Sequence, residues 1–182
     1  MLSDRELLDH INDPLTAETG FRLLVNQYQR QLYAHIRRIT GSHTDTDDVL
    51  QETFIKAWKA IGSYRKEAAL FHWLLAIATN EALSHLRKQR IVNMLTPAMN
   101  IVSVSAQPVS EPAPDGLNIE RQFIKAFATL SVKQKAVFSL RYYDQMPFNQ
   151  IAHILNKPEG TVKATWHQAT EKLKKQLTGN ES

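Results

Sequence analysis

Residues 147–177 read PFNQIAHILNKPEGTVKATWHQATEKLKKQL, and the fold can be worked out from this stretch. Apolar residues recur on one face over Phe148–Leu155, as in a short amphipathic helix. Asn156-Lys157 follows as a tight turn, because asparagine tolerates a left-handed backbone. A proline then opens a longer helix over Pro158–Gln176, where its missing N–H would be unpaired in any case. A short helix, a turn and a longer helix predict a helix-turn-helix.

The longer helix divides into two faces when its residues are placed at about 100° each. The face predicted to be buried is apolar and consists of Val162, Trp166, Ala169, Leu173 and Leu177. The face predicted to be exposed is mostly basic or able to hydrogen-bond, and consists of Lys163, Ala164, His167, Gln168, Glu171, Lys174 and Lys175. Such a face suits reading of a DNA major groove, whereas Lys172, Lys174 and Lys175 suit phosphates better than bases. The alternative is an ordinary helical hairpin with a solvated lysine face.

Positive charge is concentrated in the last third of the 182-residue chain. The net charge is +4, and residues 118–182 carry ten basic against five acidic side chains, whereas residues 1–90 carry 12 against 11. A basic region points to a polyanion, most often nucleic acid. The chain has no cysteine, which excludes disulfides and thiolate metal sites. Without a signal-like start or a long apolar run, we expect a soluble, cytoplasmic protein that needs no cofactor or metal.

The rest of the chain predicts an all-α fold of two small helical domains, at residues 1–90 and 118–182. Four prolines and several serines between Met94 and Gly116 disfavour both helix and strand, so we predict a flexible linker over 91–117. Apolar residues at three- and four-residue steps predict helices at about 21–39, 45–61, 69–90, 119–129, 132–143, 148–155 and 158–176. No segment alternates clearly enough to be a strand.

The helix predicted after Gly41-Ser42, with Asp45 as its N-cap, has an unusual outer face. Its inward stripe is expected to be Leu50, Phe54, Ala57, Trp58 and Ile61. Its opposite stripe consists of Asp48, Glu52, Ile55 and Lys59, and Gln51 flanks it. Acidic residues are common on a solvated face, and a single exposed isoleucine is common too. A branched side chain among acids nevertheless favours a protein partner, because the acids would repel a DNA backbone.

Aromatic and basic residues are interleaved around the next predicted helix. Tyr64, Arg65 and Lys66 precede it, Phe71, Trp73 and Asn80 lie within it, and Arg87, Lys88 and Arg90 end it. Rings that stack on bases and cations that hold phosphates are typical of single-strand binding. Phe71 and Leu74 are expected in the core. Trp73 and Asn80 are seven residues apart and share a face, and the sequence leaves open whether they are core or binding residues.

Three stretches, in this order along the chain, resemble a known family. Residues 45–58 (DTDDVLQETFIKAW) resemble the polymerase-binding signature of bacterial sigma factors. Residues 71–80 (FHWLLAIATN) resemble the adjoining promoter-melting segment, and residues 151–163 (IAHILNKPEGTVK) resemble the reader of the −35 element. Together they resemble the short, two-domain extracytoplasmic-function (ECF) class of the sigma-70 family.

The resemblance implies a role for each surface. Core RNA polymerase would be bound, at the β′ clamp coiled coil, by Asp48, Gln51, Glu52 and Ile55. The melted −10 strand would be held by Tyr64, Arg65, Trp73, Asn80, Arg87 and Lys88. The −35 duplex would be read by Pro158, Thr161, Lys163, Ala164, His167, Gln168 and Lys172. The β flap of the polymerase and an anti-sigma factor would be further partners.

Two positions depart from the family pattern, which often has glycine at Asn156 and a basic residue near Gln168. The second departure concerns the −35 preference rather than the mode of binding. One alternative is a stand-alone helix-turn-helix regulator that binds duplex operators as a dimer, but it leaves the pattern of residues 45–58 unexplained. An enzyme is disfavoured, because the seven histidines lack zinc-like spacing and the chain has no P-loop, GxSxG or HExxH motif.

Overall fold

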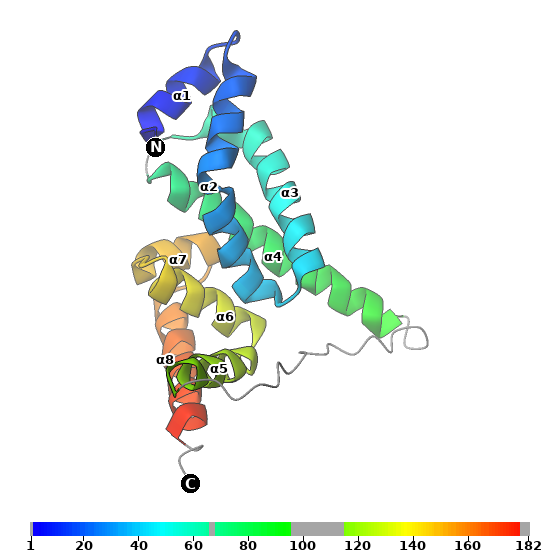
Figure 1. Cartoon of the computed structure of the whole chain (residues 1–182), viewed down its shortest axis with the longest axis vertical. Coiled ribbons are helices and arrows are strands. Elements are labelled where there is room, and N and C mark those ends of the chain that lie inside the picture. Colours follow the sequence, from blue (N-terminus) through cyan, green and yellow to red (C-terminus); the bar gives the residue numbers. More distant parts are fainter. Residues whose placement is uncertain (1, 66–67, 96–114, 179–182) are drawn as a thin grey trace. The chain divides into compact units, whose positions relative to one another are not determined.

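The computed structural model describes residues 2–65, 68–95 and 115–178 (Figure 1). Every regular element within these ranges is helical, which confirms the predicted all-α fold. The chain divides into two compact units, Met1–His85 and Leu86–Ser182. Over the described ranges, no helix combines the length and the apolar character needed to cross a membrane.

The first unit is organised around a long central helix, α2. Its elements are α1 (Asp4–Asn12), α2 (Ala17–Thr40), α3 (His43–Ala60), the short 3-10 helix η1 (Ile61–Ser63) and α4 (Leu70–Leu95), whose last residues pass into the second unit. Helix α2, blue in Figure 1, packs against both α1 and α3. The core takes branched side chains from every α-helix of the unit: Leu7, Leu8, Ile11, Leu24, Leu32, Ile36, Ile39, Val49, Leu70, Leu74 and Leu75.

Helix α1 lies outside every helix predicted from the sequence, although its start carries a recognisable signal. Ser3 and Glu6 form a capping box: the Ser3 hydroxyl accepts from the Glu6 N–H, and the Glu6 carboxylate accepts from the Ser3 N–H. The helix then packs closely on α2 at Gly20, where an added Cβ would lie 2.7 Å from the Cβ of His10. A larger residue at this position would therefore push α1 away from α2.

One buried polar contact ties α2 to α4 inside this core. His35 and Thr79 are both fully buried, and the Nε2 of His35 lies 2.8 Å from the hydroxyl of Thr79. The same hydroxyl donates to the carbonyl of Leu75 at 2.7 Å. Because leaving a buried imidazole nitrogen without a partner is costly, the contact of His35 with Thr79 favours the observed register of the two helices.

Several predicted boundaries differ from those observed. Helix α3 begins at His43 rather than at about residue 45, and the prediction that Asp45 is its N-cap was wrong. Ser42 is the N-cap, and its hydroxyl accepts from the backbone N–H of Asp45. The linker predicted over 91–117 is shorter at both ends, because α4 continues through Leu95 and α5 begins at Asp115. The remainder of that predicted linker, residues 96–114, lies outside the described residues.

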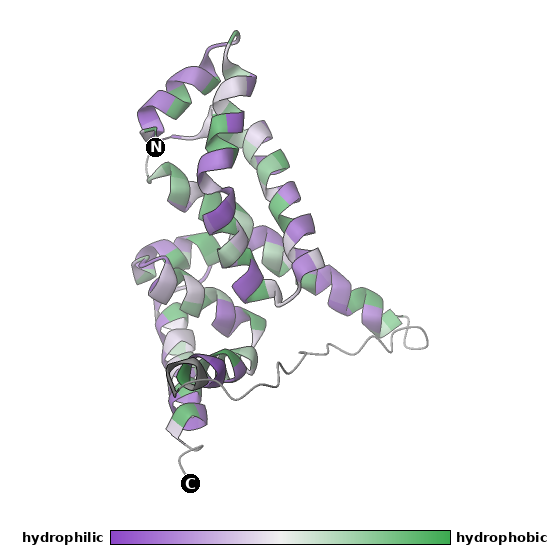
Figure 2. Cartoon of the chain, in the orientation of Figure 1, coloured by the Kyte–Doolittle hydropathy of each residue, from purple (hydrophilic) through white to green (hydrophobic). Residues whose placement is uncertain are grey.

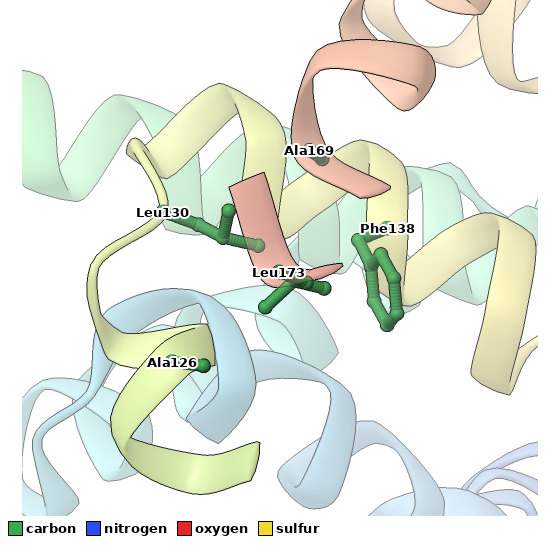
Figure 3. Close-up of a cluster of buried hydrophobic side chains, with 5 residues drawn as sticks. All are labelled: Ala126, Leu130, Phe138, Ala169 and Leu173. Atoms are coloured by element: carbon green, nitrogen blue, oxygen red, sulfur yellow. The ribbon is translucent and has the colours of Figure 1, made fainter. Parts of the chain in front are cut away.

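The second unit contains α5 (Asp115–Ala128), α6 (Val132–Phe138), the π-helix η2 (Ser139–Tyr143), α7 (Phe148–Leu155) and α8 (Glu159–Thr178). A second capping box, between Ser131 and Gln134, starts α6. The single helix predicted over 132–143 is thus an α-helix that widens into a π-turn. Figure 3 shows a core cluster drawn from α5, α6 and α8 and the turn after α5: Ala126, Leu130, Phe138, Ala169 and Leu173. Four partly buried side chains pack against this cluster: Phe123, Phe127, Trp166 and Leu177.

Candidate functional site

The outer face of α3 carries the four residues expected to bind the polymerase. Asp48, Gln51, Glu52 and Ile55 are all exposed, and Ile55 is 38% exposed. Asp48, Glu52 and Ile55 follow one another at steps of four and three residues and Gln51 flanks them, so the four residues form a single ridge along the helix, which we call the α3 ridge. The ridge thus combines two carboxylates with an apolar side chain.

Trp58 extends the α3 ridge, and the prediction that it points into the core was wrong. Its side chain is 44% exposed and meets the ring of Phe21 edge-on, with 4.9 Å between the ring centroids. Leu50 and Phe54, also predicted to be inward, are only half-buried. The fully inward positions hold smaller side chains instead: Thr46, Val49, Thr53 and Ala57.

The buried threonines explain why the inward face of α3 differs from the one that hydropathy predicts. The hydroxyl of Thr53 donates to the carbonyl of Val49 at 2.7 Å, and the hydroxyl of Thr46 donates to the carbonyl of Ser42 at 2.5 Å. A threonine that satisfies its hydroxyl on its own helix can be buried at little cost. A hydropathy pattern assigns such residues to the outside, so the larger Trp58 was assigned to the inside.

Two polar side-chain contacts hold α3 against α4. The Nζ of Lys56 lies 2.6 Å from a carboxylate oxygen of Glu81, and the Nε2 of His85 lies 2.9 Å from a carboxylate oxygen of Asp45. Asp45 is therefore engaged inside the unit, whereas Asp48 and Glu52 are exposed on the ridge. These two contacts fix the position of α3 relative to α4.

The outer face of α4 carries the residues expected to hold single-stranded DNA. Trp73, Asn80 and Arg87 follow one another at seven-residue steps and therefore share one face. Asn80 and Arg87 are exposed, and Trp73 is half-buried. The sequence left open whether Asn80 is a core or a surface residue, and the structure shows that it is a surface residue. Lys88 is exposed beside Arg87, and the last turns of α4 change from hydrophilic to hydrophobic (Figure 2).

Tyr64 and Arg65 lie before α4, and Tyr64 joins its outer face. The rings of Tyr64 and Trp73 are 5.3 Å apart between centroids, and the Tyr64 hydroxyl donates to the carbonyl of Ala68. Burial, helped by the charge of Asp4, raises the pKa of Tyr64, so its phenol stays neutral. Arg65 is exposed. The expected core residues Phe71 and Leu74 are half-buried and buried, respectively.

The turn between α7 and α8 has the predicted left-handed geometry. Asn156 has a φ of 49° and a ψ of 53°, and its N–H donates to the carbonyls of Ala152 and His153. Lys157 N–H donates to the carbonyl of Ala152 at 3.0 Å. Asparagine thus fills a position for which glycine is the usual residue, without a change in the turn.

The predicted division of α8 into an inner and an outer face is confirmed. Val162, Ala169 and Leu173 are buried, whereas Trp166 and Leu177 are partly buried against the core. The residues expected to contact the −35 duplex are exposed at and after the start of α8: Pro158, Thr161, Lys163, Ala164, His167 and Gln168. Lys163 is paired with Glu159 at 2.7 Å, one turn away.

Lys172 lies one turn after Gln168 on α8, but unlike the other expected DNA contacts it is half-buried. Its Nζ donates to the backbone carbonyl of Thr129, so it ties α8 to the turn between α5 and α6. Lys174 and Lys175 remain exposed. Lys174 lies 3.0 Å from Glu171, and this hydrogen bond lowers the pKa of the Glu171 carboxyl. Among the described residues, Lys175 is thus an exposed cation at this end of α8, whereas Lys174 is paired with Glu171.

Comparisons with known proteins account for both units. The family model described as Sigma-70 region 2 matches residues 24–91, and that described as Sigma-70, region 4 matches residues 126–175. The chain is 30% identical to the ECF RNA polymerase sigma factor SigW of Bacillus subtilis, over 88% of this chain and 90% of the relative. It is 29% identical to the ECF RNA polymerase sigma-E factor of Haemophilus influenzae, over 97% and 96%.

Solved structures agree with this assignment. The sigma factor RpoE of Bartonella quintana, in complex with the anti-sigma factor NepR, matches with a TM-score of 0.70 and 25% identity, over 87% of this chain and 96% of that one. CnrH, in complex with the cytosolic domain of CnrY, matches with a TM-score of 0.63 and 20% identity, over 98% and 99%, and supports the fold.

The two matched regions and the helix-turn-helix define a promoter-recognition factor of the sigma-70 type. The chain belongs to the ECF group of this family, and it directs RNA polymerase to promoters. Proteins of this family are transcription initiation factors rather than enzymes. The match to region 2 also accounts for residues 45–58, which a stand-alone regulator would leave unexplained.

Proposed function

We propose that this ECF sigma factor divides its work among three exposed faces. The α3 ridge binds the β′ clamp coiled coil of core polymerase, the outer face of α4 holds the melted −10 strand, and the outer face of α8 reads the −35 duplex. The observation that carries the proposal is the exposure of acidic and apolar side chains together on α3, whereas the outer faces of α4 and α8 carry cations.

The chemistry of the α3 ridge suits a protein partner. Ile55 and Trp58 supply apolar area, and Asp48 and Glu52 flank it with negative charge. Protein interfaces commonly have an aromatic or aliphatic centre with a polar rim, and complementary charges at the rim select the partner and speed association. A basic patch on the polymerase would complete the pairing, whereas DNA would be repelled.

The outer face of α4 suits an unpaired strand. Trp73 and Tyr64 offer ring surface, Asn80 offers both a donor and an acceptor, and Arg87 offers a cation further along. From Trp73 to Arg87 the helix rises about 21 Å, long enough to follow several nucleotides. Stacking of a base on an aromatic ring contributes about 1–3 kcal/mol, comparable with the ~1.4 kcal/mol needed to open one base-pair step. Capture of a few bases therefore offsets much of a short opening.

The outer face of α8 suits duplex DNA. Lys163, His167 and Gln168 can donate to base edges in the major groove, and the small Ala164 permits close approach or contact with a thymine methyl group. Because Lys163 is paired with Glu159, DNA binding has to exchange this ion pair for a contact with a base or phosphate. The neutral Gln168 favours a base with both a donor and an acceptor, such as adenine.

Two further partners follow from the same role. The β flap of the polymerase would bind the second domain while α8 lies on the −35 duplex. An anti-sigma factor would hold the protein inactive, which is supported by the likeness to RpoE of Bartonella quintana, a sigma factor solved with its anti-sigma factor NepR. The protein would act in the cytoplasm, where its polymerase works.

Co-migration with core RNA polymerase in size exclusion tests the docking surface. We expect the wild-type protein to co-migrate with the polymerase and Glu52→Lys to elute alone, because the substitution reverses a charge on the α3 ridge. Glu18→Lys makes the same charge change at an exposed position of α2 and serves as the matched control. Equal binding by wild type and Glu52→Lys would refute the α3 ridge as the docking surface.

A further inference from the structure

One carboxylate at the start of α1 joins three helices of the first unit. The Oδ1 of Asp4 accepts a hydrogen bond from the hydroxyl of Tyr28 in α2 at 2.8 Å. Its Oδ2 accepts one from the backbone N–H of Leu70 in α4 at 2.9 Å. Asp4 and Leu70 are 66 residues apart, so the contact exists only in the folded unit.

The second of these hydrogen bonds is made at a sensitive position. Leu70 is the first residue of α4, and N–H groups in the first turn of a helix have no partner within the helix. A carboxylate that accepts from such a group stabilises the helix start, both by the hydrogen bond and by its charge at the positive end of the helix dipole. Asp4 thus caps α4 from another part of the chain.

Aromatic contacts connect the first turn of α4 to the proposed −10 face. The ring of Tyr28 stacks on that of Phe71 with 5.5 Å between centroids and 23° between planes. Burial and the hydrogen bond to Asp4 raise the pKa of Tyr28 to about 12, so its hydroxyl remains a donor. Tyr64, whose pKa is raised by burial and to a lesser extent by the charge of Asp4, packs against Trp73 one turn into α4.

The residues on either side of Asp4 in the chain hold it in place. The backbone of Leu2 makes two hydrogen bonds with the side chain of Gln27, at 3.1 and 3.0 Å. The capping box of Ser3 and Glu6 sets the direction of α1 one residue before Asp4. The carboxylate therefore meets its partners with little loss of side-chain entropy on either side.

We propose that Asp4 is a positioning residue for binding of the −10 strand. It acts through Leu70 and Tyr28, which fix the first turn of α4 and hence Trp73 and Tyr64. It does not touch DNA, because its two oxygens are already engaged and a carboxylate would repel phosphates. This inference rests on the proposed role of α4, and it adds the N-terminal helix to the promoter-melting machinery.

The test uses full-length protein in holoenzyme with core polymerase. The probe is a fluorescein-labelled fork DNA with duplex −35 and single-stranded −10 positions, selected by wild-type holoenzyme from a pool randomised at those positions. Fluorescence anisotropy gives the affinity for the fork and for the −35 duplex alone, and titration of core polymerase gives the affinity for the polymerase. Thermal unfolding gives stability.

We expect Asp4→Ala to weaken fork binding about tenfold, because two partly buried donors lose their acceptor. Asp4→Asn should weaken it about threefold, since the amide oxygen can still accept from one donor. Affinities for the −35 duplex and for core polymerase should change less than about twofold. Asp9→Ala is the matched control, because Asp9 is an exposed aspartate on the same helix.

The possible outcomes separate this inference from the proposed function. If wild-type holoenzyme enriches no fork sequence from the randomised pool, the proposed role of α4 falls and the inference falls with it. If the wild type binds and Asp4→Asn binds equally well, only the inference is overturned. A parallel loss of fork, −35 and polymerase affinity with Asp4→Asn would show a general role in stability and would also overturn it.

Discussion

Helices α3 and α8 each present one face to solvent, but they place their large apolar side chains in opposite ways. Helix α3 buries two threonines and an alanine and leaves Trp58 44% exposed. Helix α8 packs Trp166 flat against Phe138, 5.2 Å between centroids, and leaves no large apolar residue on its outer face. A face with apolar area suits a protein partner, whereas a polar, cationic face suits the wet surface of DNA. The position of the tryptophan therefore distinguishes the two kinds of surface.

The largest expected effect comes from the two tryptophans themselves. Trp166→Ala should lower the free energy of unfolding by about 3 kcal/mol, because it removes a ring that packs on the core of the second unit. Trp58→Ala should cost less than about 1 kcal/mol, since much of its ring is already in water. Urea unfolding measures both values.

For polymerase affinity, the expected order of the two variants is the reverse of that for stability. We expect Trp58→Ala to weaken binding of core polymerase about 30-fold, as for an aromatic residue at the centre of an interface. Trp166→Ala, titrated under conditions where it remains folded, should lose much less polymerase affinity. If Trp58→Ala destabilises the fold as much as Trp166→Ala and binds polymerase normally, the contrast between α3 and α8 is broken.

A smaller effect is expected from His167 on the outer face of α8. His167→Ala should weaken binding of the −35 duplex about tenfold, the reduction typical of removing one base-specific hydrogen bond. Affinity for core polymerase should not change, because His167 lies on the outer face of α8, which is proposed to face DNA, and in a different unit from the α3 ridge. Anisotropy with the −35 duplex and polymerase titration measure the two quantities. A loss of polymerase affinity in this variant would contradict the division of labour between the helices.

The helix-turn-helix could be predicted because its information is local. The helical periodicity, the turn at Asn156-Lys157 and Pro158 all lie within one short stretch of sequence. The large apolar side chains of α8 also point inwards, as a hydropathy pattern assumes. Orientation of α3 could not be predicted in the same way, because Thr46 and Thr53 satisfy their hydroxyls on their own helix and occupy the core. Helix α1 is not among the predicted helices, although Ser3 and Glu6 have the spacing of a capping box, which marks a helix start.

The contacts of Asp4 and Lys172 were beyond prediction for a different reason. Each joins residues far apart in the chain, and neither leaves a periodic trace in the sequence. Lys172 looks like any other lysine near the end of a basic helix. Only the folded unit shows that its ammonium group is used on a backbone carbonyl.

The difference between Lys172 and Lys175 predicts the smallest effect, a change in the salt dependence of binding to the −35 duplex. Removing one lysine that binds a DNA phosphate should reduce the slope of log affinity against log salt concentration by about 0.9. We expect Lys175→Gln to lower the slope for the −35 duplex by about that amount, because Lys175 is exposed and basic at the end of α8. Lys172→Gln should leave the slope unchanged and lower stability slightly, since its partner is the carbonyl of Thr129. A drop in slope for Lys172→Gln would mean that this lysine leaves the carbonyl for a phosphate when DNA binds, and the cationic face of α8 would then be wider than the free protein indicates.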